Sequence, residues 1–169
     1  MSHPRKLYRL VQAVACVGGL ALPGAASAAN FTFIAVLNSG QEIQDTKPAS
    51  NALGTALLTL TTRTRLLCYS ISYTDLLGAE TEAHFHAPAS AGQNANILFF
   101  ISPPPNGPSP PGSPKTGCVG PLTGKQMSNL KKGLFYINVH SATFPAGEIR
   151  GQVLPINGVK TRGAVAEPG

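Results

Sequence analysis

Three histidines, His84, His86 and His140, are the residues of this chain whose type and spacing best suit chemistry. His84 and His86 flank Phe85, and successive side chains of a β-strand point to opposite faces, so both imidazoles would share one face. Neutral imidazoles suit transition metals, and three of them leave a coordination position open. A His-x-His pair alone is more typical of surface histidines. The pattern predicts a metal site only if the segment that carries His140 is a neighbouring strand.

His140 ends a segment in which apolar and polar side chains alternate. The apolar residues of such a strand face the core, so His140 is expected on the opposite, outward face. We therefore expect all three histidines on outward polar faces. The apolar set is Phe135, Ile137 and Val139, while Tyr136 and Asn138 share the face of His140 and are interpreted as structural.

Short strands are the elements that must position these side chains. The chain has 18 Gly and 15 Pro among 169 residues, which favours many turns over long helices. Segments of alternating polarity at this spacing predict an all-β, antiparallel barrel or sandwich with one short helix. Prolines cannot donate to a strand ladder, so segment 102–114 is expected as a surface loop. The predicted strands are 31–37, 55–62, 66–74, 83–87, 97–102, 134–141 and 148–154, and the predicted helix is 125–132.

The first 28 residues have the pattern of a secretory signal peptide. Three basic residues precede the apolar stretch 10–22, and Ala26-Ser27-Ala28 forms a small-residue cleavage site. An N-terminal core helix would leave the basic flank and the small-residue exit unexplained. We therefore expect a secreted or periplasmic protein without a transmembrane anchor.

Removal of residues 1–28 changes the formal net charge from +6 to +3, because Arg5, Lys6 and Arg9 are lost. The remaining basic residues are dispersed, which is not the pattern of a nucleic-acid-binding surface. Two cysteines remain, Cys68 and Cys118, and in an oxidising compartment they predict one disulfide. Two independent buried thiols are the alternative. No nucleophile has a base and an orienting acid at a recognisable spacing, which argues against a hydrolase.

Several segments resemble the CHRD domain, the repeat of chordin and of many single-domain secreted bacterial proteins. They are Ala83–Ala87, Leu134–Ser141 with its Y-I-N-V-H run, and Pro145–Gln152 with G-E-I-R-G-Q. Phe33-x-Ala35-x-Leu37, Gln41-Glu42 and Gly54-x-Ala56 fit the opening of that family. The resemblance covers about residues 31–154, and we expect a CHRD domain over 29–156 and a C-terminal tail over 157–169. The family implies an extracellular module, and its biochemical activity is broadly described as unknown.

The order of the histidines is also similar to that of copper-zinc superoxide dismutases, which are Greek-key β-barrels. In that family a His-x-His copper pair is followed by a further copper ligand as V-H and by an arginine that guides the anion. No other histidine lies between His86 and His140, so a two-metal site is not expected, and copper fits better than zinc. The resemblance implies His84, His86 and His140 as copper ligands, Arg150 for anion guidance or for an ion pair, and Glu82 or Glu148 as carboxylates that orient an imidazole.

Two hypotheses from different classes follow. The first is a secreted β-barrel that binds one metal ion, copper, through three histidines, with chemistry like that of a superoxide dismutase. The second is a non-catalytic extracellular module that binds a protein partner or a matrix, in which the histidines only hydrogen-bond to loops. Convergence of the three imidazoles in the folded chain would favour the first.

Overall fold

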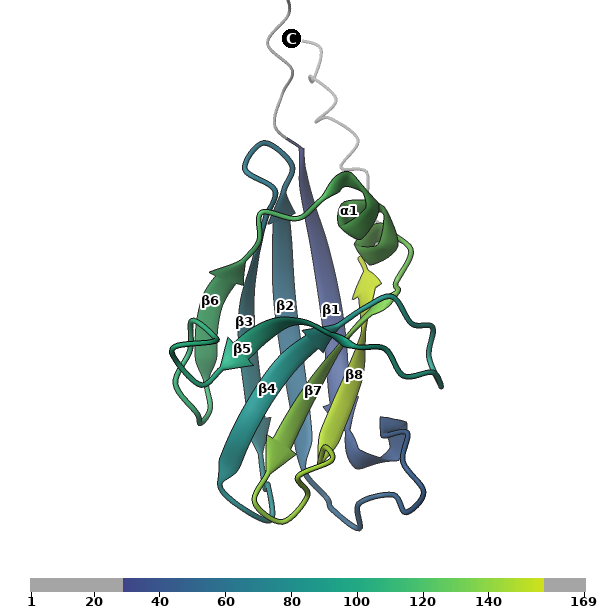
Figure 1. Cartoon of the computed structure of the whole chain (residues 1–169), viewed down its shortest axis with the longest axis vertical. Coiled ribbons are helices and arrows are strands. Elements are labelled where there is room, and N and C mark those ends of the chain that lie inside the picture. The colour runs from purple at the N-terminus through teal and green to yellow at the C-terminus, as the bar shows by residue number, and fades with distance from the viewer. Residues whose placement is uncertain (1–28, 157–169) are drawn as a thin grey trace, which may run out of the picture.

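The computed structural model describes residues 29–156. The expected signal peptide, 1–28, and the expected tail, 157–169, lie outside the described residues. In the described part, eight antiparallel strands form one strongly curved sheet with a single α-helix, which confirms the all-β prediction (Figure 1). No helix in this part of the chain is long and apolar enough to cross a membrane. The strands are β1 (Asn30–Asn38), β2 (Leu53–Thr61), β3 (Leu66–Thr74), β4 (Glu80–His86), β5 (Ile97–Ser102), β6 (Lys115–Val119), β7 (Phe135–Ser141) and β8 (Ile149–Pro155).

The strand order is β5-β4-β7-β8-β1-β2-β3-β6. β7 returns beside β4 after β5 and β6 have been formed, which is the crossover of a Greek key. The two edge strands, β5 and β6, approach each other and nearly close the barrel. In Figure 1, β4, β7 and β8 cross in front of β1, β2 and β3. The chain thereby places the two histidine-bearing strands, β4 and β7, side by side.

The barrel interior is filled by every second residue of the strands, as a period of two requires. β1 buries Phe33, Ala35 and Leu37, while Ile34 and Val36 between them are exposed. β7 and the second half of β4, residues 83–86, differ, because they are buried on both faces. Their inward residues, such as Phe85 and Ile137, belong to the core, so loops must cover their outward residues.

The sequence predicted seven strands and missed β6. β6 has only five residues, KTGCV, and it directly follows the proline-rich segment, so it shows neither a long alternation nor an apolar run. The predicted helix is present as α1 (Gly124–Lys131), one residue earlier than expected. Thr123 is its N-cap, and Gln126 completes a capping box with it.

Cys68 and Cys118 form the predicted disulfide. The two residues are direct cross-strand partners in the register of β3 and β6. The disulfide therefore fastens the short edge strand β6, and the proline-rich loop before it, to the barrel.

Removal of this disulfide should lower the free energy of unfolding by about 2–4 kcal/mol, because the cross-link closes a loop of 50 residues in the unfolded chain. Chemical denaturation of the Cys68→Ala/Cys118→Ala double variant measures the loss. Wild-type protein under reducing conditions is the control and should show the same decrease. A change below about 1 kcal/mol in both experiments would contradict this role.

A buried ion pair ties the barrel together near its closure. The side chains of Glu80 of β4 and Lys115 of β6 are both almost fully buried. The Lys115 Nζ donates to both carboxylate oxygens, at 2.7 Å for Oε1. The Tyr73 hydroxyl of β3 and the Ser102 hydroxyl of β5 also donate to this carboxylate. Lys115 further donates to the carbonyl of Gly112 at 2.7 Å. One carboxylate thus links four strands and the proline-rich loop.

Candidate metal centre

The strand register brings together the three histidines that the sequence left on separate segments. β4 and β7 are antiparallel neighbours, with Glu82 opposite His140 and His84 opposite Asn138. The condition that the sequence could not test, adjacency of the two strands, is met.

The three imidazoles converge. One ring nitrogen of each of His84, His86 and His140 lies within 4.8 Å of the corresponding nitrogens of the other two. The ring centroid of His84 is 4.9 Å from that of His140 and 5.6 Å from that of His86. Nitrogens that bind one metal ion at about 2.0–2.1 Å lie about 3–4 Å apart. Small side-chain adjustments would therefore bring these three around a single ion.

Hydrogen bonds to main-chain carbonyls orient two of the rings. The Nδ1 of His86 lies 3.0 Å from the carbonyl of Ala95, and the Nδ1 of His140 lies 3.0 Å from the carbonyl of Pro145. A carbonyl only accepts, so each Nδ1 must carry a proton, and in the neutral form of each ring Nε2 then keeps its lone pair. Both Nε2 atoms are buried and have no hydrogen-bond partner. Buried polar atoms nearly always have a hydrogen-bond partner. The lone pairs of these two Nε2 atoms are therefore free to bind a metal ion.

His84 is the most enclosed ring of the three. It is 1% exposed, and neither of its nitrogens makes a hydrogen bond. Burial, and then the neighbouring His140 and His86, lower the pKa of His84 to about 4. Burial also lowers the pKa of His86, against the effect of its hydrogen bond to Ala95. These two imidazoles are therefore neutral near pH 7, which is the form that binds a metal ion.

The histidines point away from the barrel core as predicted, but His84 and His86 are not exposed. Phe100 of β5 packs edge-on against the ring of His84, with 4.8 Å between centroids. The segment between β4 and β5 covers His86 through the carbonyl of Ala95. His140 is partly exposed. The sequence pattern could not reveal this cover, because it comes from a loop without periodicity.

Arg150 lies on β8 opposite Asn138, but its guanidinium is not directed to solvent. It is 2% exposed, and it donates to the side-chain oxygen of Asn94 at 2.8 Å and to the carbonyl of Gln93 at 2.5 Å. Its Cζ lies 3.5 Å from the ring centroid of Tyr136, and the same ring stacks on His86 at 4.6 Å. In this geometry Arg150 holds the covering loop in place. Anion guidance by Arg150 stays a prediction.

The two carboxylates named from the sequence lie in different places. Glu82 is half-exposed, and its carboxylate oxygen is 3.3 Å from the Nε2 of His84. Glu148 is fully buried and is not hydrogen-bonded to an imidazole. Its carboxylate accepts from the hydroxyl of Ser50 at 2.6 Å, from the hydroxyl of Ser141 and from the main-chain N–H of Leu77 at 2.8 Å. Main-chain carbonyls orient His86 and His140, and Glu82 is the carboxylate that lies beside the ring of His84.

Glu42 also lies in this region, although the sequence did not predict a functional role for it. It is 2% exposed, and its Oε2 accepts from the Nδ2 of Asn138 at 3.4 Å. Burial raises the pKa of Glu42 to about 7, although Arg150 and the hydrogen bond from Asn138 act in the opposite direction. The only indication in the sequence was that Glu42 belongs to Gln41-Glu42, one of the segments that resemble the CHRD family. A glutamate in a loop gives no periodicity that would predict its burial.

The raised pKa of Glu42 predicts a pH dependence of stability. The folded chain holds this proton more tightly than the unfolded chain, whose pKa is near 4.5, so the free energy of unfolding should fall as pH rises from about 4.5 to about 7. The upper limit of this loss is about 3 kcal/mol. Denaturation of Glu42→Gln between pH 4 and 8 should show a flatter profile than wild type. Asp45→Asn, an exposed acid in the same loop, should leave the profile parallel to wild type, and parallel profiles for both variants would refute the assignment.

Comparison with known proteins identifies the family of this barrel. The model of the CHRD domain matches residues 33–153, and the chain therefore belongs to the CHRD family. The matched span runs from β1 to β8 and includes all three histidines. Neither a search of curated proteins nor a search of solved structures gives a match.

Proposed function

We propose that this CHRD domain binds a single transition-metal ion, copper, through His84, His86 and His140. The observation that carries the proposal is the convergence of the three rings together with the buried, unpartnered Nε2 atoms of His86 and His140. Two main-chain carbonyls hold these rings in the tautomer that a metal ion requires. A cluster that served only to hydrogen-bond loops would have no reason to leave these nitrogens unsatisfied.

Copper is proposed because the donor set consists of imidazoles. Imidazole nitrogens suit copper and zinc, and Cu(II) binds most tightly in the divalent series. No carboxylate is among the three converging groups, which disfavours magnesium, calcium and manganese. In the described residues, no second group of histidine, cysteine or acidic side chains complements the three, so the proposed site is mononuclear.

Copper bound at this site would supply one-electron redox chemistry, of which superoxide dismutation is one example. The protein's part would be to hold three imidazoles in a largely buried pocket and to leave one coordination position open. Tyr136 and Arg150 would keep the covering loop on His86. The disulfide is compatible with an oxidising compartment, and we propose that the protein acts there, secreted or periplasmic.

Metal-specific spectroscopy tests the proposal. Purified protein stripped of metal would be offered equal amounts of Cu(II) and Zn(II) and then analysed for both. We expect about one copper per chain with little zinc, and an electron paramagnetic resonance spectrum with splitting from nitrogen ligands. A spectrum without nitrogen splitting would exclude the three imidazoles as ligands. Superoxide consumption by the copper-loaded protein then separates redox chemistry from metal binding alone.

A further inference from the structure

Strands β1, β2 and β3 contain no charged residue at all. Their inward residues belong to the core, but their outward residues form one wall of the barrel surface. A soluble protein normally covers such a wall with charged side chains, because these keep sheet faces from associating. We name this wall, formed by the outward side chains of β1, β2 and β3, the neutral face.

Large apolar side chains are exposed on the neutral face and on the neighbouring strand β8. Ile34 and Leu57 are direct cross-strand partners, and Ile34 is also opposite Leu154 of β8. Leu57 is 54% exposed and Leu154 is 51% exposed. These three side chains form an apolar row across neighbouring strands. Contiguous exposed apolar surface of this kind typically marks an interaction site.

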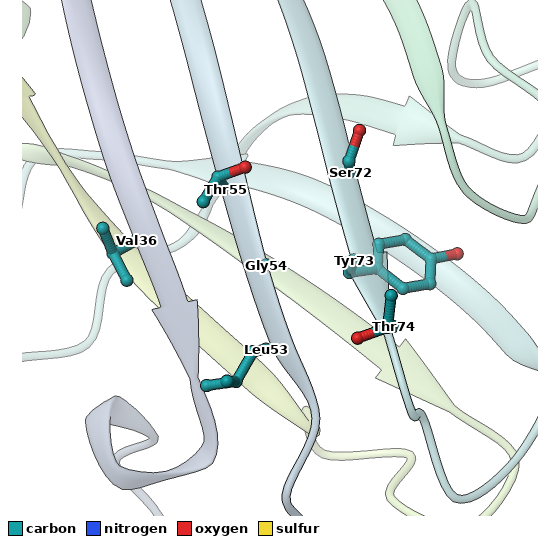
Figure 2. A pocket seen from close by; sticks show the side chains of 7 residues that line it. All are labelled: Val36, Leu53, Gly54, Thr55, Ser72, Tyr73 and Thr74. Atoms are coloured by element: carbon teal, nitrogen blue, oxygen red, sulfur yellow. The ribbon is translucent and has the colours of Figure 1, made fainter.

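A hollow of about 320 Å³ adjoins this row. Val36 and Leu53 line it with 53% and 58% of their surfaces exposed, and Thr55 and Ser72 add small side chains (Figure 2). Figure 2 shows that Val36, Thr55 and Ser72 come from the three neighbouring strands β1, β2 and β3. The same face thus has both an exposed apolar row and an apolar hollow.

We infer that the neutral face is the contact surface between two copies of this chain. In a two-fold contact each patch must complement itself, and a face with a row beside a hollow can place the row of one copy against the hollow of the other. The absence of charge disfavours nucleic acids and highly charged partners. It also lets two positively charged chains approach each other through a wall on which neither copy carries a charge.

The area of the face agrees with this inference. Three strands of nine residues, about 4.8 Å apart and rising about 3.3 Å per residue, cover roughly 430 Å² in projection. Corrugation by side chains and the contribution of Leu154 raise the accessible area to the order of 600 Å² per copy. Two copies would bury more than the roughly 1,000 Å² expected of a specific interface.

Charges at the ends of the strands indicate how two copies would be oriented. Arg63 and Arg65 are exposed at the turn between β2 and β3, and Asp75 is exposed at the opposite end of β3. A two-fold axis perpendicular to the strands would place this turn opposite the second copy's Asp75. An axis parallel to the strands would place the arginines opposite each other. We therefore expect the antiparallel arrangement.

Sedimentation equilibrium of the purified protein over a wide concentration range tests the dimer. Wild type should have the mass of two chains at high concentration. Leu57→Lys should shift the dissociation constant by at least 100-fold, because it places two charges in the contact. Leu77→Lys is the matched control, since Leu77 is 57% exposed but lies outside the neutral face, and it should remain dimeric. Val36→Lys provides a second disruptive variant should Leu57→Lys fail to fold.

Three outcomes would overturn the inference. One is wild type that stays monomeric at every concentration, which would leave the face to a different protein or to a lipid surface. A second is a dimer that both Leu57→Lys and Val36→Lys leave intact, and the third is a dimer that Leu77→Lys disrupts equally. The copper content of each variant should equal that of wild type, so failure of the dimer is distinguishable from failure of the metal site.

Discussion

His140→Ala should lower the affinity for Cu(II) by more than about 100-fold while the domain stays folded. Loss of a partner that only orients a ligand costs 10–100-fold in metal affinity, and loss of a ligand itself should cost more. His140 is the ligand to remove first, because it is partly exposed whereas His84 and His86 are buried, so its truncation leaves the smallest cavity. Competition titration against a chelator of known affinity measures the change.

Phe100→Leu is the matched control for this prediction. Phe100 packs against the ring of His84, so its replacement disturbs the surroundings of the site without removing a nitrogen. Its copper affinity should stay close to that of wild type. Equal losses in Phe100→Leu and His140→Ala would show that packing, and not the His140 nitrogen, determines binding.

Glu80→Gln should destabilise the fold by about 3–5 kcal/mol, because it leaves the ammonium of Lys115 buried without its counter-charge. Burial alone would raise the pKa of Glu80, but the hydrogen bonds from Lys115, Ser102 and Tyr73 outweigh it and the pKa is lowered. The carboxylate is thus charged in the native state. Its stabilising contribution is present above the ordinary pKa of a glutamate and is lost as pH falls through the lower, folded-state value.

Denaturation of single and double variants separates the ion pair from the packing around it. Glu80→Gln/Lys115→Met removes both charges and should recover a large part of the lost stability, since an apolar side chain tolerates burial. Lys125→Met is the control, because Lys125 is exposed in the first turn of α1. It should change the free energy of unfolding by less than about 0.5 kcal/mol. Our interpretation would be wrong if Glu80→Gln were as mild as Lys125→Met.

The sequence predicted those parts of the fold that repeat locally. Alternation in segments such as 66–74 indicated the strands, and the helix predicted over 125–132 is present as α1. β6 was missed because a five-residue strand after prolines derives its structure from pairing with β3 and from the disulfide. Its residues alone contain too little pattern to predict that pairing.

The candidate site was predictable in composition but not in its surroundings. Period-two spacing put His84 and His86 on one face, and only the topology could place His140 beside them. The carbonyls of Ala95 and Pro145 that fix the tautomers are main-chain groups, which no side-chain pattern reveals. The same holds for the hydrogen bonds that turn Arg150 toward the covering loop.

Copper stoichiometry of wild type and of the His84→Ala/His86→Ala/His140→Ala variant tests the central claim most directly. Both proteins would be expressed with copper in an oxidising compartment, purified in parallel and analysed for bound metal per folded chain. We predict about one copper per wild-type chain and almost none in the triple variant, with circular dichroism confirming that the barrel is intact. Equal copper content in the two folded proteins would contradict the three-histidine site.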